Sequence, residues 1–137
     1  MLILIVLAWA PNVLSIYRDR SPWLPMREIA HLASANSLAS DLILVQSIPS
    51  GVLAIARYTN GPAAMASWVE QLKSRHVPES LQQLAGGRTR IVFVKVHEVG
   101  APAPEEEWLR ANAVLARETR LKLGLVVDFR PKNGPTF

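Results

Sequence analysis

The stretch Arg90-Ile91-Val92-Phe93-Val94-Lys95-Val96 decides the fold of this 137-residue chain. β-Branched and aromatic side chains of this kind favour strands over helices. A second apolar run, Leu42–Val45, follows Asp41 without a polar interruption, as in strands that are buried on both faces. A third strand is predicted over Leu121–Phe129, where Gly124 marks a bulge or a kink. These three segments predict a small sheet.

Helical spacing separates the three strands. Pro25 opens the first helix, and the apolar residues that follow it recur at helical intervals along one face. Glu105-Glu106-Glu107 opens the last helix, with its acids at the positive end of the helix dipole. The predicted helices cover residues 25–38, 52–58, 63–72, 78–84 and 105–117. This order predicts an α/β fold with a small, mainly parallel three-stranded sheet and flanking helices.

The composition narrows the classes of function. Half of the residues are apolar and 19% are charged, which is typical of a folded domain. The net charge of +4 is spread along the chain without a basic stripe, so we expect no nucleic-acid partner. The chain has no cysteine, which excludes disulfides and thiol catalysis. His31, His76 and His97 lack ligand-like spacing, so we expect neither a metal site nor a cofactor.

The apolar segment at the start of the sequence is the strongest indication that the protein is attached to a membrane. Leu2–Tyr17 carries no charge, and the first charged residue is Arg18. A membrane span needs about 20 apolar residues, and a short or truncated span fits this run. Two alternatives stay open: a signal peptide cut near Ala8-Trp9-Ala10, and a buried helix or strand of a soluble fold. We adopt the membrane helix. The predicted organisation is an apolar transmembrane helix over residues 1–20, a soluble α/β domain over 21–130 and a tail over 131–137.

The turn that follows the first strand is the best candidate for a ligand site. Ligands of open α/β sheets bind beyond the carboxyl ends of the strands. There the amides of a helix start, with Ser50 and Gly51, could hold a phosphate. His97 follows the second strand at the same edge and could act with Glu98 as an acid/base pair. The candidate ligand-binding residues are Ser47, Ser50, Gly51, Arg57, Tyr58 and His97.

Each of these features also has a plain structural interpretation. In that interpretation the turn is an ordinary strand-to-helix connection with Arg57 on a solvated edge, and His97-Glu98 belongs to an ordinary loop. Glu105-Glu106-Glu107 could bind a divalent ion, but helix-start electrostatics explains the run better. No G-x-S-x-G elbow is present, so we assign no catalytic residue.

Several short motifs carry a resemblance to a known family. An apolar helix ends in Tyr17-Arg18-Asp19-Arg20-Ser21-Pro22-Trp23, and the segments Ser40–Val45, Ser50-Gly51-Val52 and Ala56-Arg57-Tyr58 follow, with Trp68 in the next predicted helix. Together they resemble the carboxyl-terminal end of bacterial membrane glycosyltransferases of the GT-C type. That group includes protein mannosyltransferases and aminoarabinose transferases, and the likeness is to its glycosyltransferase family 39 branch. The resemblance covers essentially the whole chain.

The resemblance implies a non-catalytic part of a larger enzyme. In that family a bundle of membrane helices carries the catalytic carboxylates, which match no position of this chain, and a small α/β domain follows the last span. The partners it implies are the membrane, a missing N-terminal membrane domain and, through that domain, a polyprenyl-phosphate-sugar donor. The implied location is the membrane, with the soluble domain periplasmic and placed to shape the acceptor site. Arg18, Arg20 and Arg27 instead favour a cytoplasmic side for the domain.

Two other functions remain open at this point. A free α/β protein could bind a phosphorylated ligand at the Ser50-Gly51 turn, with Arg57 as the cation. A membrane-anchored module could bind a partner without any chemistry. Whether the chain belongs to an enzyme is therefore not decided by the sequence.

Overall fold

Strand β3 (Arg90–Val96) lies at the centre of a five-stranded mixed sheet with the order β2-β1-β3-β5-β4. The computed structural model describes residues 24–67, 77–97 and 103–137. The other strands are β1 (Asp41–Gln46), β2 (Ala64–Ser67), β4 (Ala113–Leu121) and β5 (Gly124–Pro131). β2, β1 and β3 are parallel, whereas β5 pairs antiparallel with both β3 and β4.

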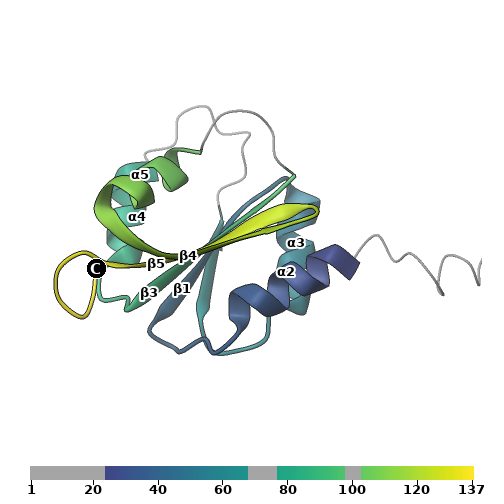
Figure 1. Cartoon of the computed structure of the whole chain (residues 1–137), viewed down its shortest axis with the longest axis horizontal. Helices are drawn as coiled ribbons and strands as arrows, with labels where there is room; N and C mark the ends of the chain where they lie inside the picture. Colours follow the sequence, from purple (N-terminus) through teal and green to yellow (C-terminus); the bar gives the residue numbers. More distant parts are fainter. Residues whose placement is uncertain (1–23, 68–76, 98–102) are drawn as a thin grey trace, which may run out of the picture.

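Helices cover both faces of this sheet, which gives three layers (Figure 1). α2 (Leu24–Ser34) and α3 (Pro49–Tyr58) lie on one face, and α4 (Val77–Ala85) and α5 (Pro104–Asn112) lie on the other. The buried strand residues alternate between two cores, as the two-residue period of a strand requires. The core under α2 and α3 contains Ile43, Val45, Val92 and Val94, and the core under α4 and α5 contains Leu42, Leu44, Ile91 and Phe93. This double covering explains why β1 and β3 are continuously apolar.

The α/β class is confirmed, but the prediction of a three-stranded, mainly parallel sheet is wrong. β2 occupies the start of the predicted helix 63–72, and β4 occupies the end of the predicted helix 105–117. Ser67 Oγ donates to the Val45 carbonyl at 2.6 Å, which fastens β2 to β1. β4 pairs with β5 along its whole length. Tertiary strand pairing therefore overrides the local helical spacing in both segments.

The predicted first helix is confirmed with a shorter end. Met26, Ile29, Ala30 and Ala33 are buried, as the predicted apolar face requires. The helical spacing predicts Leu38 on the same face, but Leu38 is 61% exposed because α2 ends at Ser34. The helix stops where Ser34 Oγ donates back to the Ala30 carbonyl, and Asn36 then adopts a left-handed backbone conformation with φ of 54°.

The direction of α2 determines where the preceding chain enters. The last residues of α2 lie beside the beginning of β3, because Arg90 donates to the carbonyls of Ala33 and Ala35. Ile29, in the middle of the helix, lies against Gly124, which pairs with the end of β3. α2 therefore runs antiparallel to β1, and its first residue, Leu24, lies toward the carboxyl edge of the parallel strands (Figure 1).

The structure describes the carboxyl-terminal end of the chain but not residues 1–23. The predicted transmembrane helix of residues 1–20 lies outside the described residues, and none of the helices within 24–67, 77–97 and 103–137 is long and apolar enough to span a bilayer. In the predicted tail, Phe137 exchanges backbone hydrogen bonds with Gly87 and Arg88. Its ring also packs against the core under α4 and α5.

Candidate functional site

The carboxyl ends of β1 and β3 form the crevice where ligands of α/β sheets bind. These two strands are adjacent and parallel. The helix that follows β1 lies on one face of the sheet, whereas the helix that follows β3 lies on the other. Such a change of side is the topological switch point, which opens a gap outside the strand ends. Ser47 and His97 are the first residues after these two strands.

The structure brings Ser47, His97 and Gly51 together at this point. Ser47 Oγ lies 3.1 Å from His97 Nδ1, within hydrogen-bond distance. Ser47 is buried, and His97 is in the left-handed backbone region with φ of 58°. A Cβ atom on Gly51 would lie 2.0 Å from Ser47 Oγ and 2.9 Å from His97 Nδ1. A glycine is therefore required here for α3 to begin so close to the pair.

The turn at the start of α3 offers few free amides. Pro49 has no N–H, and the amides of Gly51 and Val52 both donate to the Ile48 carbonyl, at 2.9 and 3.1 Å. Ile48 is the N-cap and supplies no side-chain hydrogen bond. A phosphate at this turn would therefore find the Ser50 amide and hydroxyl, but not the full set of donors that helix starts usually present.

Arg57 and Tyr58 lie at the opposite end of α3. Seven positions separate Ser50 from Arg57, which is about 10 Å along a helix. The Arg57 guanidinium lies over the Tyr58 ring at 5.8 Å from its centroid, a cation–π contact on the surface. Of the six predicted site residues, the structure gathers Ser47, Gly51 and His97, places exposed Ser50 beside them, and separates Arg57 and Tyr58 from them.

A hollow of about 280 Å³ adjoins His97, and the sequence did not predict it. The tip of the β4–β5 hairpin forms its other walls, with Arg120, Lys122 and Leu123 among the lining residues. The predicted helix 105–117 covers the first part of β4, and the predicted strand Leu121–Phe129 runs through the two-residue turn Lys122-Leu123, so the prediction misses this hairpin. With His97, Arg120 and Lys122, the hollow suits oxygen-rich or anionic groups.

The Ser47–His97 pair offers a hydroxyl and an imidazole within hydrogen-bond distance of each other. A serine–histidine pair becomes a nucleophile and base when a third group orients the imidazole. Among the described residues, no carboxylate is hydrogen-bonded to His97, and Glu98 lies outside these residues. In the same part of the chain, no three histidine or acidic side chains gather as metal ligands would.

Glu106, the middle residue of the acidic run at the start of α5, belongs to an ion-pair network. Lys95 Nζ lies 3.5 Å from Glu106, both largely buried, and Glu106 also pairs with Arg110 at 2.9 Å. Arg110 reaches Glu118 on β4 at 3.1 Å. The hydrogen bond from Arg110 lowers the pKa of the Glu118 carboxyl, and the bonds to Glu118 and Glu106 raise the pKa of Arg110. The network fastens the hairpin to α5, and Arg120 continues it by pairing with Glu118.

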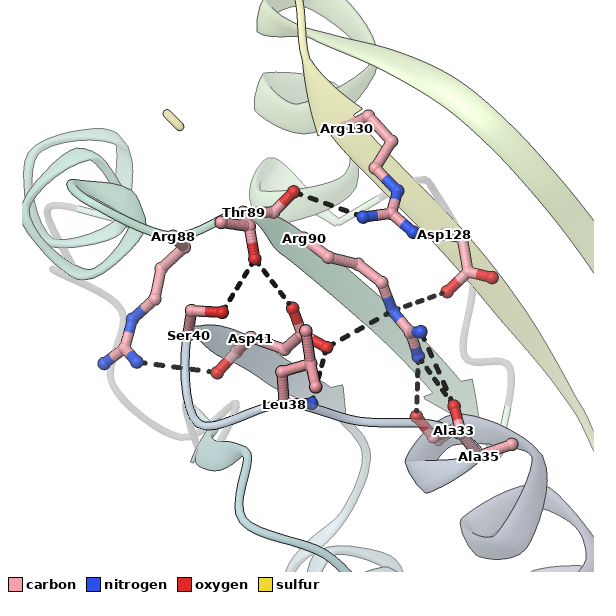
Figure 2. Close-up of polar contacts among 10 residues, drawn as sticks. All are labelled: Ala33, Ala35, Leu38, Ser40, Asp41, Arg88, Thr89, Arg90, Asp128 and Arg130. Carbon is pink, nitrogen blue, oxygen red and sulfur yellow. Dashed lines mark hydrogen bonds and ion pairs between the residues drawn. The ribbon is translucent and has the colours of Figure 1, made fainter. Parts of the chain in front are cut away.

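A second polar cluster lies at the opposite edge of the sheet and holds α2 in place (Figure 2). The guanidinium of Arg90 lies 3.9 Å from Asp41 and 3.4 Å from Asp128, as ion pairs. It also donates to the carbonyls of Ala33 and Ala35 at 3.4 Å. A cation at the carboxyl end of a helix is stabilised by the helix dipole. Arg90 therefore joins α2, β1 and β5 at one point.

Further hydrogen bonds complete this cluster. Thr89 Oγ1 donates to Asp41 at 3.0 Å, and the Leu38 amide donates to the same carboxylate at 2.9 Å. Arg88 donates to the backbone carbonyl of Asp41 and Arg130 to that of Thr89 (Figure 2). The Asp41 carboxylate thus has partners on both oxygens, which marks the cluster as structural.

Comparisons with protein-family models, with curated proteins and with solved structures find no significant match to this chain.

Proposed function

We propose that this chain is the last span and the soluble domain of a polyprenyl-phosphate-sugar-dependent membrane glycosyltransferase. In this proposal a membrane domain that precedes the chain performs the transfer. The soluble domain is non-catalytic, lies on the periplasmic side and shapes the region where the acceptor is held. The support from the sequence is the resemblance carried by Tyr17–Trp23, Ser40–Val45 and Ala56-Arg57-Tyr58.

One structural observation carries the proposal: the entry point of the chain and the candidate site share one edge. α2 begins at the carboxyl edge of the parallel strands, where Ser47 meets His97. Residues 18–23 join α2 to the apolar segment, and six residues span at most roughly 20 Å. An apolar segment in lipid would therefore hold this edge close to the membrane. Lipid-linked sugars and their transfer to acceptors belong to that region.

The chemistry of the edge supports a holding role. Ser47 and His97 offer hydrogen bonds, and Arg120 and Lys122 offer positive charge beside them. Such groups suit hydroxyl-rich or phosphate-bearing molecules. The alternative of a free protein that binds a phosphorylated ligand at the Ser50-Gly51 turn has less support, because two amides of the turn are occupied and Arg57 is distant.

The size and location of the native polypeptide test the proposal. An epitope is added after Phe137 at the chromosomal locus, and membranes are washed with alkaline carbonate before immunoblotting. We expect a carbonate-resistant band far larger than the 15.1 kDa of this chain. Removing the coding region for residues 24–137 should impair transfer of sugar from a polyprenyl-phosphate donor in isolated membranes. A tagged product no larger than the 15.1 kDa chain plus its epitope would contradict the proposal. If that product also resisted carbonate, the alternative of a membrane-anchored binding module would be favoured.

A further inference from the structure

Exposed apolar side chains and cations occur together at the carboxyl edge of the sheet. Leu123, at the tip of the β4–β5 hairpin, is 41% exposed, and Ile48, before α3, is 40% exposed. Lys122 precedes Leu123 on the tip, and the side chain of Arg120 is 72% exposed. Single exposed apolar side chains are ordinary on a soluble surface, and Leu53 is more exposed than either of these. This edge differs because two apolar side chains at loop positions lie at the same end of the sheet as two cations. The same combination is typical of protein surfaces that rest on lipid headgroups.

Two separate segments contribute to this surface, and the fold holds them at one edge. Ile48 follows β1 by two positions, next to Ser47, whose hydroxyl is bonded to His97. Leu123 precedes Gly124, which pairs with Val96 at the end of β3. The hollow beside His97 adjoins the hairpin tip. Both apolar side chains therefore lie at the end of the sheet from which α2 leads back to the apolar segment.

The proposed attachment of the chain to the membrane indicates that this surface contacts lipid. Seven positions separate Tyr17 from Leu24, the first residue of α2, which allows at most roughly 25 Å between them. A domain tethered so closely meets a bilayer at high effective concentration. The positive charge of Lys122 complements anionic headgroups, which attract bases near the membrane surface. Arg120 also pairs with Glu118, but 72% of its side chain stays exposed on the same side.

We infer that Ile48, Arg120, Lys122 and Leu123 form a lipid-contacting edge, with the two apolar side chains entering the interface and the two cations meeting lipid phosphates. This inference rests on one part of the proposed function, the location of the apolar segment in lipid. It adds a contact between the soluble domain and the bilayer itself. The Ser47–His97 pair and its hollow then open directly above the headgroups.

The absence of cysteine makes a direct test simple. Single variants Leu123→Cys and Ile48→Cys of the full chain are labelled with an environment-sensitive fluorophore and reconstituted into vesicles that contain anionic phosphatidylglycerol and a nitroxide-headgroup lipid. Leu38→Cys is the matched control, since Leu38 is 61% exposed and precedes β1 at the opposite edge. We expect blue-shifted emission and strong nitroxide quenching at positions 123 and 48, and water-like emission without quenching at position 38.

The charges are tested with the label at position 48. Lys122→Glu should lower the equilibrium constant for contact between position 48 and the membrane, measured by nitroxide quenching, by at least about fivefold. One basic residue near an anionic surface contributes about that factor. Lys132→Glu, just beyond β5 at the opposite edge, should leave it unchanged. Replacing phosphatidylglycerol with neutral phosphatidylcholine should weaken quenching in the unmodified background.

The outcomes separate this inference from the proposed function. A chain that carbonate strips from the vesicles would overturn the location of the apolar segment and, with it, the proposed function. A chain that resists carbonate but shows water-like emission at positions 123 and 48, as at position 38, would overturn the lipid-contacting edge alone. Equal quenching in anionic and neutral vesicles would overturn the role of Lys122 and Arg120.

Discussion

Ser47 Oγ and His97 Nδ1 lie 3.1 Å apart although 50 positions separate the two residues in the chain. The contact exists because β1 and β3 are neighbours and end at the same level, with Gln46 opposite Lys95. It also depends on the residue that starts α3, because Gly51 approaches both side chains more closely than any Cβ atom could. The polar pair and the glycine therefore form one unit.

Gly51→Ala should break this unit and destabilise the domain. The new methyl group would need the space that Ser47 Oγ occupies, and the start of α3 would have to move away from the strand ends. Overpacking of this kind costs about 1–3 kcal/mol in free energy of unfolding. Urea unfolding of the full chain in mild detergent measures the loss, and the NMR signals of the His97 ring should shift.

Gly86→Ala is the matched control for this substitution. A Cβ atom there would meet only backbone oxygens at 3.4 and 3.7 Å, which is close to ordinary contact. We expect a change in unfolding free energy within about 0.5 kcal/mol. Equal stability of the two alanine variants, with an unchanged His97 spectrum, would show that Gly51 does not determine the geometry of the pair.

The centre of the fold could be predicted from sequence because its signals are local and strong. β1 and β3 are buried on both faces and are therefore apolar at every inner position, which no helix at the surface imitates. β2 has four residues, too few for a period-two pattern. β4 is an edge strand with mostly exposed side chains, so its residues carry little information about pairing. Their identity as strands comes from hydrogen bonds to β1 and β5.

The candidate site was predictable in part for the same reason. The rule that ligands bind beyond the carboxyl ends of parallel strands pointed to Ser47, Gly51 and His97, which the structure gathers. Arg57 is a predicted member of the site because it follows the turn closely in the sequence. Along a helix, however, two residues seven positions apart are separated by about 10 Å. The hollow at the hairpin tip is missed because the prediction places a helix over the first residues of β4 and a continuous strand, Leu121–Phe129, over the turn.

Arg90→Met should strongly destabilise the domain, because Arg90 is buried at the point where α2, β1 and β5 meet. The substitution keeps the apolar stem but leaves Asp41, which is 2% exposed, without its cation. It also removes the donors to the Ala33 and Ala35 carbonyls at the end of α2. Breaking one side of a buried ion pair costs about 3–5 kcal/mol. Thermal unfolding followed by circular dichroism should show a correspondingly large drop in Tm.

Arg88→Met provides the comparison, because Arg88 is only partly buried and forms no ion pair with Asp41. It donates to three backbone carbonyls, those of Ala39 at 3.2 Å, Leu84 at 3.4 Å and Asp41 at 3.5 Å. These bonds are long and mostly solvent-exposed, so we expect a net loss of about 1 kcal/mol, well below that of Arg90→Met. If both methionine variants lost the same stability, the cluster in Figure 2 would not act as the clamp on α2 that its contacts indicate.

Glu118→Gln should make stability less dependent on pH in the acidic range. The Arg110 guanidinium lowers the pKa of Glu118 in the folded domain, so the folded state favours the ionised carboxylate. The stabilisation is fully present above the ordinary glutamate pKa of about 4.3 and is lost as the pH falls through the lowered value. Both side chains are partly exposed, so the contribution is about 0.2–1 kcal/mol at neutral pH.

The difference in Tm between the parent chain and Glu118→Gln, measured from neutral pH down to strongly acidic pH, checks this prediction. We expect a lower Tm for the variant at neutral pH and convergence of the two curves below the lowered pKa. Glu28→Gln, at an exposed position of α2, is the matched control and should have a Tm close to that of the parent at neutral pH. A gap between parent and Glu118→Gln that widens toward acid would contradict the assigned direction of the pKa shift.

Phe137 should matter for stability although it is the final residue of the sequence. Its amide donates to the Arg88 carbonyl at 2.9 Å, and its carbonyl accepts from the Gly87 amide at 3.3 Å. Its partly buried ring packs against the core that contains Phe93 and Leu109. Phe137→Ala removes the ring but keeps both backbone bonds, whereas deletion of Phe137 removes all three contacts. We expect a loss of about 1–2 kcal/mol for the alanine variant and a further loss of about 1 kcal/mol for the deletion. Urea midpoints of the two variants separate these contributions, and midpoints equal to that of the parent would mean that this end of the chain does not hold α4 against the sheet.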